Sequence, residues 1–114
     1  MVMKSRALAI DTITATATIA EGEGCDRDGT LASTNADFYG FAQYNAVSGD
    51  LLAVGTAGDF TGIVGAVAVT EGQLLKIASG LLVDATAGTE NFIALEAGDV
   101  GDKILVNIIT NNRF

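Results

Sequence analysis

Apolar and hydroxyl-bearing residues alternate near the start of the chain. Within residues 7–20, the odd positions from Ile13 to Ile19 are apolar, and the even positions from Thr12 to Thr18 are threonines. A period of two is the pattern of an extended strand with one buried face. The β-branched side chains also disfavour a helix there, because they lose rotamer freedom against the preceding turn. The pattern therefore predicts a strand over this stretch.

The rest of the chain consists of short apolar segments separated by glycine-containing turns, and proline is absent. This punctuation is typical of an all-β domain. Strands are predicted over residues 38–44, 51–54, 62–70, 74–78, 81–83, 92–96 and 103–110, and a polar surface loop over residues 21–36. The clearest hairpin is the pair of strands divided by Ser79-Gly80. We therefore predict a single all-β domain, a small β-barrel or β-sandwich, with an extended N-terminal arm.

Two parts of the chain resemble one another. At a constant offset of 52 residues, a strand end, a Gly-Asp turn and a second strand recur: Phe41-Ala42, Gly49-Asp50 and Val54 match Ile93-Ala94, Gly101-Asp102 and Val106. Glu21-Gly22 and Glu71-Gly72 also match, at an offset of 50. A chain rich in Gly and Ala can produce such a match by chance, so duplication and coincidence are both open. A duplication would favour a pseudo-symmetric barrel or sandwich.

Composition limits the chemistry that this chain can perform. Its 114 residues suit one domain, and 49% hydrophobic with 18% charged residues predict a packed core. His and Trp are absent and Cys25 is the one cysteine, which argues against most enzymes, an intrachain disulfide and a thiolate metal site. The acidic segment 25–29 lacks two ligand positions of a calcium loop, so we interpret it as a solvated loop. We predict no catalytic residue, cofactor or metal.

The net charge of -8 limits the partners. Such a chain repels the phosphate backbone of nucleic acids and anionic membrane surfaces. The longest apolar run, residues 62–69, is too short to span a bilayer, and Asp11 interrupts the stretch that could otherwise form a signal peptide. We therefore expect a soluble protein made in a cytoplasm, without a nucleic-acid, membrane or small-molecule partner.

Two segments are candidates for contact with another chain. Lys4 and Arg6 make the start of the chain positive although the body is negative, so the arm is either a loose end or a strand that pairs with another chain's sheet edge. In the aromatic-rich segment 38–44, Tyr39 and Phe41 are expected on one strand face, with Phe38 and Tyr44 on the other, either in the core or at an interface. The candidate interface residues are Lys4, Arg6, Ile10, Ile13, Tyr39 and Phe41.

Several sequence phrases follow one another between Glu21 and Ile109. They are Phe38-Tyr-Gly-Phe-Ala-Gln-Tyr, Ser48-Gly-Asp-Leu-Leu-Ala-Val, Glu71-Gly-Gln-Leu-Leu-Lys-Ile and a closing segment from Ile93 that contains Ala-Leu-Glu-Ala and two Gly-Asp pairs. Together they resemble the small head-decoration, or capsid cement, proteins of tailed bacteriophages, a family of short Gly/Ala/Val-rich chains.

This resemblance implies a non-enzymatic protein that binds the outer surface of a phage head, commonly as a trimer at three-fold positions, and stabilises the shell against DNA pressure. The partner would be the major capsid protein, and the location the exterior of the virion. The resemblance does not cover the arm, residues 1–20; the β-domain would span residues 21–110 and a C-terminal tail residues 111–114. The alternative is a β-rich virion or tail-associated adhesin for a host receptor or glycan, and a small acidic enzyme ranks third.

Overall fold

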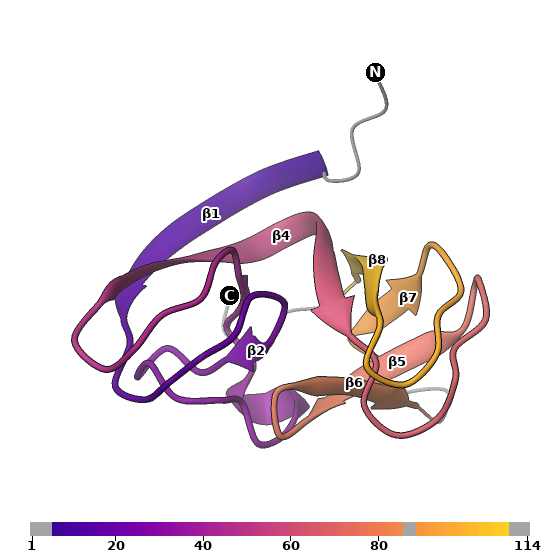
Figure 1. Ribbon diagram of the computed structural model, residues 1–114. Coiled ribbons are helices and arrows are strands. Elements are labelled where there is room, and N and C mark those ends of the chain that lie inside the picture. The colour runs from indigo at the N-terminus through magenta and orange to yellow at the C-terminus, as the bar shows by residue number, and fades with distance from the viewer. Residues whose placement is uncertain (1–5, 86–88, 110–114) are drawn as a thin grey trace.

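Eight strands form one sheet in the described residues, 6–85 and 89–109 of the computed structural model (Figure 1). The strands are β1 (Arg6–Thr14), β2 (Gly24–Cys25), β3 (Gly40–Ala42), β4 (Leu51–Ile63), β5 (Leu74–Ala78), β6 (Leu81–Asp84), β7 (Phe92–Ala94) and β8 (Lys103–Ile108). One turn of 3-10 helix, η1, spans Asn35–Asp37. The predicted all-β class is therefore confirmed.

The sheet curls until its two ends meet. Its strand order is β2-β3-β4-β8-β7-β5-β6, and β1 pairs with the first part of β4. The long strand β4 joins the two parts of the domain, because residues 51–59 pair with β1 and residues 59–63 pair with β8. At the ends of the sheet, the Gly24 N–H of β2 donates to the Gly80 carbonyl in the β5–β6 turn, at 2.8 Å. The result is a nearly closed barrel.

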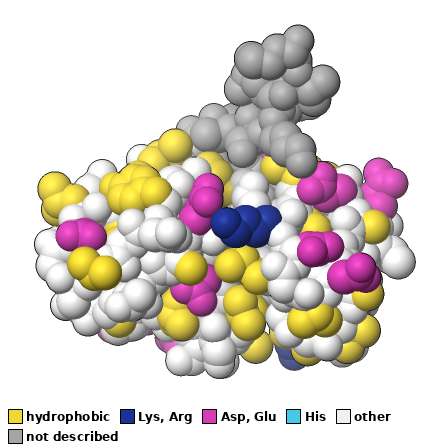
Figure 2. All heavy atoms as spheres, viewed as in Figure 1, with side chains coloured by type: hydrophobic (Ala, Val, Ile, Leu, Met, Phe, Trp, Pro, Cys, Tyr) yellow, Lys and Arg dark blue, Asp and Glu magenta, His cyan; other side chains and the backbone are white. Residues whose placement is uncertain are grey.

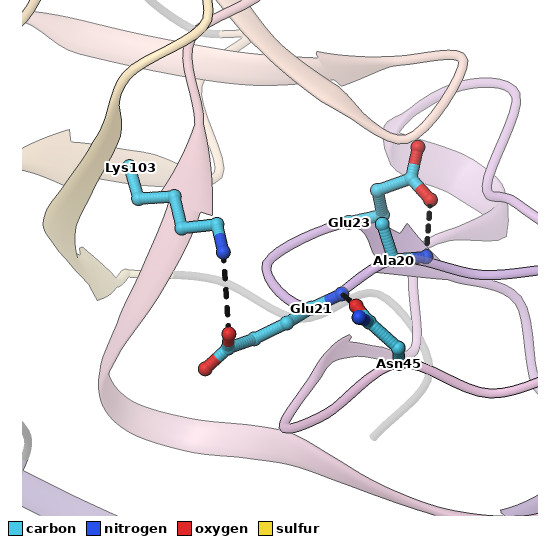
Figure 3. Close-up of polar contacts among 5 residues, drawn as sticks. All are labelled: Ala20, Glu21, Glu23, Asn45 and Lys103. Carbon is cyan, nitrogen blue, oxygen red and sulfur yellow. Dashed lines mark hydrogen bonds and ion pairs between the residues drawn. The ribbon is translucent and has the colours of Figure 1, made fainter.

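One type of turn recurs four times within the described residues, each time with a glycine at positive φ: Gly22 (91°), Gly49 (97°), Gly72 (85°) and Gly101 (90°). The next residue bonds through its side chain, at 2.7 to 3.0 Å, to the backbone N–H three positions earlier; these residues are Glu23, Asp50, Gln73 and Asp102. Figure 3 shows the first such bond, from Ala20 to Glu23. Glycine followed by an acidic or amide residue therefore punctuates this chain because the pair builds the turn.

The turns are joined in pairs, which gives the domain two similar halves. An isolated bridge links the two turns of each half, Ile19 to Ala46 in the first and Val69 to Gly98 in the second. The backbone hydrogen bond beside each bridge also recurs, from Gly22 to Ala42 at 2.9 Å and from Gly72 to Ala94 at 2.8 Å. The match seen in the sequence thus corresponds to repeated structure, which favours duplication over coincidence.

Two clusters of buried side chains form the core. The larger contains the rings of Phe38, Phe41 and Phe92, whose centroids lie 4.9 to 5.1 Å apart, together with Phe60 of β4 and aliphatic residues of β5, β6 and β8. The smaller contains Ile13, Ala15, Ile19, Cys25, Tyr39, Ala42, Ala46, Leu52 and Val54. The first 20 residues therefore supply part of the core, so the segment from Arg6 onward is integrated into the β-domain.

Four predicted elements differ from the structure. The predicted surface loop 21–36 contains the buried strand β2 and a buried Gly29, because its glycines let the backbone pack closely. The strands predicted over 51–54 and 62–70 are instead the single strand β4, which ends at Ile63. The N-terminal strand ends at Thr14 although the alternation continues, because the Thr16 N–H donates to the Gly29 carbonyl, at 3.0 Å, and not to β4.

The prediction that Tyr39 and Phe41 share a strand face is also wrong. Phe41 lies in the larger core cluster and Tyr39 in the smaller one, whereas Phe38 joins Phe41. The cause is local: η1 ends at Asp37 and β3 begins only at Gly40, so residues 38 and 39 do not continue the two-residue period of the strand.

Candidate functional site

Side chains with catalytic or metal-binding chemistry do not gather in the part of the chain that the structure describes. No group of three or more His, Cys, Asp or Glu side chains there could hold a metal ion. Burial raises the pKa of the Cys25 thiol to about 12, which is the opposite of nucleophile activation. Nor is any helix among the described residues long and apolar enough to cross a membrane. The exposed apolar side chains of the described residues instead indicate a surface as the candidate functional site.

Residues 51–55 at the start of β4 and residues 10–14 of β1 present a face whose described side chains are uncharged. Antiparallel register places Ile10, Thr12 and Thr14 opposite Gly55, Ala53 and Leu51, while the alternate pair of Ile13 and Leu52 is buried. Ile10 is 55% exposed and Leu51 is 67% exposed. We name Ile10, Thr12, Thr14, Tyr44, Leu51 and Ala53 the outer face.

Tyr44 extends this face beyond the two strands. Its hydroxyl donates to the Leu51 carbonyl at 2.9 Å and accepts from the Ala53 N–H at 3.1 Å, while the residue is 45% exposed. Figure 2 shows hydrophobic side chains gathered at the left end of the molecule, where Figure 1 places the start of β4. Clustered exposed apolar side chains on an otherwise acidic protein are typical of a protein contact surface.

The free edge of β1 adjoins the outer face. Within the described residues, β1 pairs with β4 along one edge, and no strand pairs with the other. An open edge can accept a strand from another chain. One of its groups is already occupied, because the Thr12 N–H donates to Asp11 Oδ1 at 2.8 Å. The edge can therefore pair with a strand of another chain, although the Thr12 N–H is already hydrogen-bonded.

Tyr39 holds β1 against the body of the domain. Its hydroxyl donates to Asp11 Oδ2, and the Arg27 guanidinium lies 4.6 Å from the centroid of its ring. The hydrogen bond from Tyr39, that from the Thr12 N–H, and the Arg27 charge together hold the pKa of Asp11 below its ordinary value. Tyr39 is therefore a residue that positions the strand from within the core.

The structure describes the side chains of four of the six candidate interface residues, and it places them both at the surface and in the core. Ile10 lies on the outer face, whereas Ile13, Tyr39 and Phe41 are buried in the core clusters, which favours the core alternative for their side chains. Arg6 is the first residue of β1, and described side chains begin at Ala9; Lys4 lies outside the described residues, as do 111–114.

Of the outer face, the candidate interface residues included Ile10 but missed Thr12, Thr14, Tyr44, Leu51 and Ala53. The signal for Leu51 was present, because alternation after the Gly49-Asp50 turn must expose one of the two successive leucines. No local signal places Tyr44 there, since its position depends on the hydrogen bonds that its hydroxyl makes with β4.

We predict that Tyr39→Phe raises the pKa of Asp11 towards its ordinary value, because the largest cause of the lowering is lost. A lowered folded-state pKa stabilises the fold above the unfolded-state pKa, about 3.9, and this contribution is lost as the pH falls through the folded-state pKa. NMR titration of the Asp11 carboxyl in both proteins measures the effect. An unchanged Asp11 titration in the variant would show that Tyr39 does not set this pKa.

Comparison with known proteins gives one informative result. No protein-family model matches the chain, and no curated protein matches it. Among solved structures, the chain is similar to the head fiber gp8.5 N base in bacteriophage phi29, with a TM-score of 0.70 and 19% sequence identity. The likeness covers 88% of this chain and 92% of that chain. The two chains share a fold. The nearly closed barrel is thus also the architecture of a phage head fiber base.

Proposed function

We propose that this protein is a non-enzymatic structural component of a phage virion, bound to the head. The observation that carries this proposal is the fold shared with the phi29 head fiber base over nearly the whole of both chains. The resemblance of the sequence phrases to head-decoration proteins agrees with it. The exposed outer face supplies a surface for such an attachment.

Within that function, we propose the role of a cement protein on the exterior of the head, with the major capsid protein as partner and a homotrimer as the bound form. A subunit with net charge -8 repels its own copies in solution and stays dispersed until it meets its lattice. When many copies bind one shell, their individually modest contacts together hold the protein strongly on the head. The uncharged outer face avoids the cost of desolvating ionised side chains in such a contact.

The contact is assigned to the outer face together with residues 1–9, the part of the arm that precedes Ile10. Ile10 and Leu51 supply the exposed apolar area, and the free edge of β1 supplies unpaired backbone groups. Lys4 and Arg6 add the positive charge that distinguishes the arm from the acidic body.

Co-sedimentation of the purified protein with undecorated phage heads, unexpanded and expanded, tests this function. Leu51→Asp is expected to weaken binding by about 30-fold, because it places a charge within the contact in place of an exposed apolar side chain. The matched control is Val67→Asp, since Val67 is as exposed as Leu51, at 67%, but lies outside the outer face; it is expected to bind like the wild type.

The arm is tested separately. Deleting residues 1–5 removes Lys4 and leaves β1 in place, so it is expected to weaken binding to heads without lowering stability.

Equal binding of Leu51→Asp and Val67→Asp to heads would show that the outer face is not part of the contact. Absence of binding to either form of head, with saturable binding to host cells or glycans, would replace the cement role with that of an adhesin.

A further inference from the structure

A groove of about 810 Å³ lies between η1 and the segment before β7 and shares no residue with the outer face. Lys76, Ile77 and Ala78 of β5 line it, because β5 pairs with β7 only at its first two residues. Beyond them, the Ile77 N–H donates to Asn35 Oδ1 at 2.7 Å. This bond occupies the strand edge, so the groove suits an inserted side chain better than an added strand.

The side chain of Asn91 is the first observation that indicates a ligand. It lines the groove and is only 4% exposed, yet its Nδ2 has no hydrogen-bond partner among the residues that the structure describes. The backbone of Asn91 is fully engaged: its N–H donates to the Leu75 carbonyl at 3.0 Å, and its carbonyl accepts from Ile109 at 2.8 Å. A buried amide donor without an acceptor destabilises a fold, so a group that accepts from it would be bound favourably.

The charge of Lys76 is the second observation that indicates a ligand. Among the cations whose side chains the structure describes, Lys103 pairs with Glu21 at 3.2 Å (Figure 3), and Arg27 lies over the Tyr39 ring. Lys76, which lines the groove, makes no ion pair within the described residues. An ammonium that makes no ion pair within the described residues, in the same groove as an orphan amide donor, favours an anionic acceptor.

The other lining residues indicate which anionic acceptor fits the groove: a single carboxylate carried on a short apolar chain. Ile77, Ala78 and Ile109 offer apolar contact. Glu90, which also lines the groove, opposes any anion, and it opposes a multiply charged one such as phosphate more strongly than a single carboxylate. None of the described lining residues is aromatic, so the groove offers no ring on which a sugar could pack.

We propose that this groove binds an aspartate or glutamate side chain of a partner protein, with Lys76 Nζ and Asn91 Nδ2 as donors to its carboxylate. The apolar lining packs the methylene stem of the inserted side chain. The inference concerns the chemistry of the groove and does not depend on the proposed attachment to a phage head.

NMR titration of the full chain with two blocked tripeptides, acetyl-Ala-Glu-Ala-amide and its Gln counterpart, tests the proposal. The Glu peptide is expected to shift the Asn91 side-chain amide saturably and to bind at least about 10-fold more tightly than the Gln peptide, because only it forms charge-assisted bonds. Equal binding of the two peptides, or no saturable shift with either, would overturn the proposal. Saturation by maltotriose alone would replace it with a glycan site.

Variants separate a binding role from a structural one. Lys76→Met and Asn91→Leu are each expected to weaken binding of the Glu peptide by about 10-fold or more, whereas Lys103→Met, a cation outside the groove, is the control and leaves binding unchanged. Asn91→Leu is also expected to raise the melting temperature, because it removes the unpaired donor. Undiminished binding by Lys76→Met and Asn91→Leu would refute the assignment, whatever the outcome with phage heads.

Discussion

Replacing Gly29 by alanine is expected to lower the free energy of unfolding by about 3 kcal/mol or more. Gly29 has a φ of 90°, where an L-residue costs about 1–2 kcal/mol. An added Cβ would also overlap the Thr14 carbonyl oxygen and lie 2.8 Å from the Thr16 nitrogen, and overpacking against rigid backbone costs about 1–3 kcal/mol. These are the groups at which the chain leaves β1, so the whole attachment of that strand would shift.

Gly49→Ala is the matched control for this substitution. Gly49 has nearly the same φ, 97°, but no atom lies within 4 Å of the position of an added Cβ. Its expected cost is therefore the conformational one alone, about 1–2 kcal/mol. Urea unfolding of both variants measures the difference. Equal losses at the two positions would show that the close approach of Gly29 to β1 does not contribute to stability.

Replacing Phe41 by alanine is expected to cost about 3–5 kcal/mol, because it deletes a fully buried ring and leaves a cavity. The ring packs between Phe38 and Phe92, at centroid distances of 4.9 and 5.1 Å. A domain of this size is commonly stable by about 5–15 kcal/mol, so the loss would be a large share of the total. Thermal and urea unfolding measure it directly.

The same substitution separates the two roles considered for Phe41. Val67→Ala, at a residue that is 67% exposed, is the control and is expected to change stability by about 0.5 kcal/mol or less. If Phe41→Ala unfolded at the wild-type urea concentration but no longer bound heads, Phe41 would belong to an interface and the core assignment would be wrong.

Local patterns accounted for much of the fold. The β5–β6 hairpin was predicted within one residue, because Ser79 and Gly80 take the positive φ values, 50° and 80°, that a two-residue turn requires. The strands β7 and β8 lie inside their predicted ranges for a related reason, since a glycine turn or a polar break bounds each segment. Such signals depend only on neighbours along the chain.

Features that depend on contacts between residues far apart in the chain could not be predicted from the sequence. Nothing near Gly24 and Cys25 indicated that they form a buried strand, because their burial depends on β3 and on the β5–β6 turn. The candidate interface residues were hard to place for the same reason. An apolar residue on a strand gives the same sequence pattern whether its side chain packs in the core or contacts a partner protein. Thus Ile13 and Phe41 proved buried, and Ile10 exposed.

The sequence by itself determined the all-β class, the repeated glycine turns and the acidic, histidine-free character of the chain, because period, turn chemistry and charge are local or additive properties. Only the tertiary structure decided that residues 6–14 join the sheet, that an uncharged face opens beside Leu51, and that Lys76 and Asn91 line one groove. These features arise from strand pairings between residues far apart in the chain, whose register no local pattern specifies.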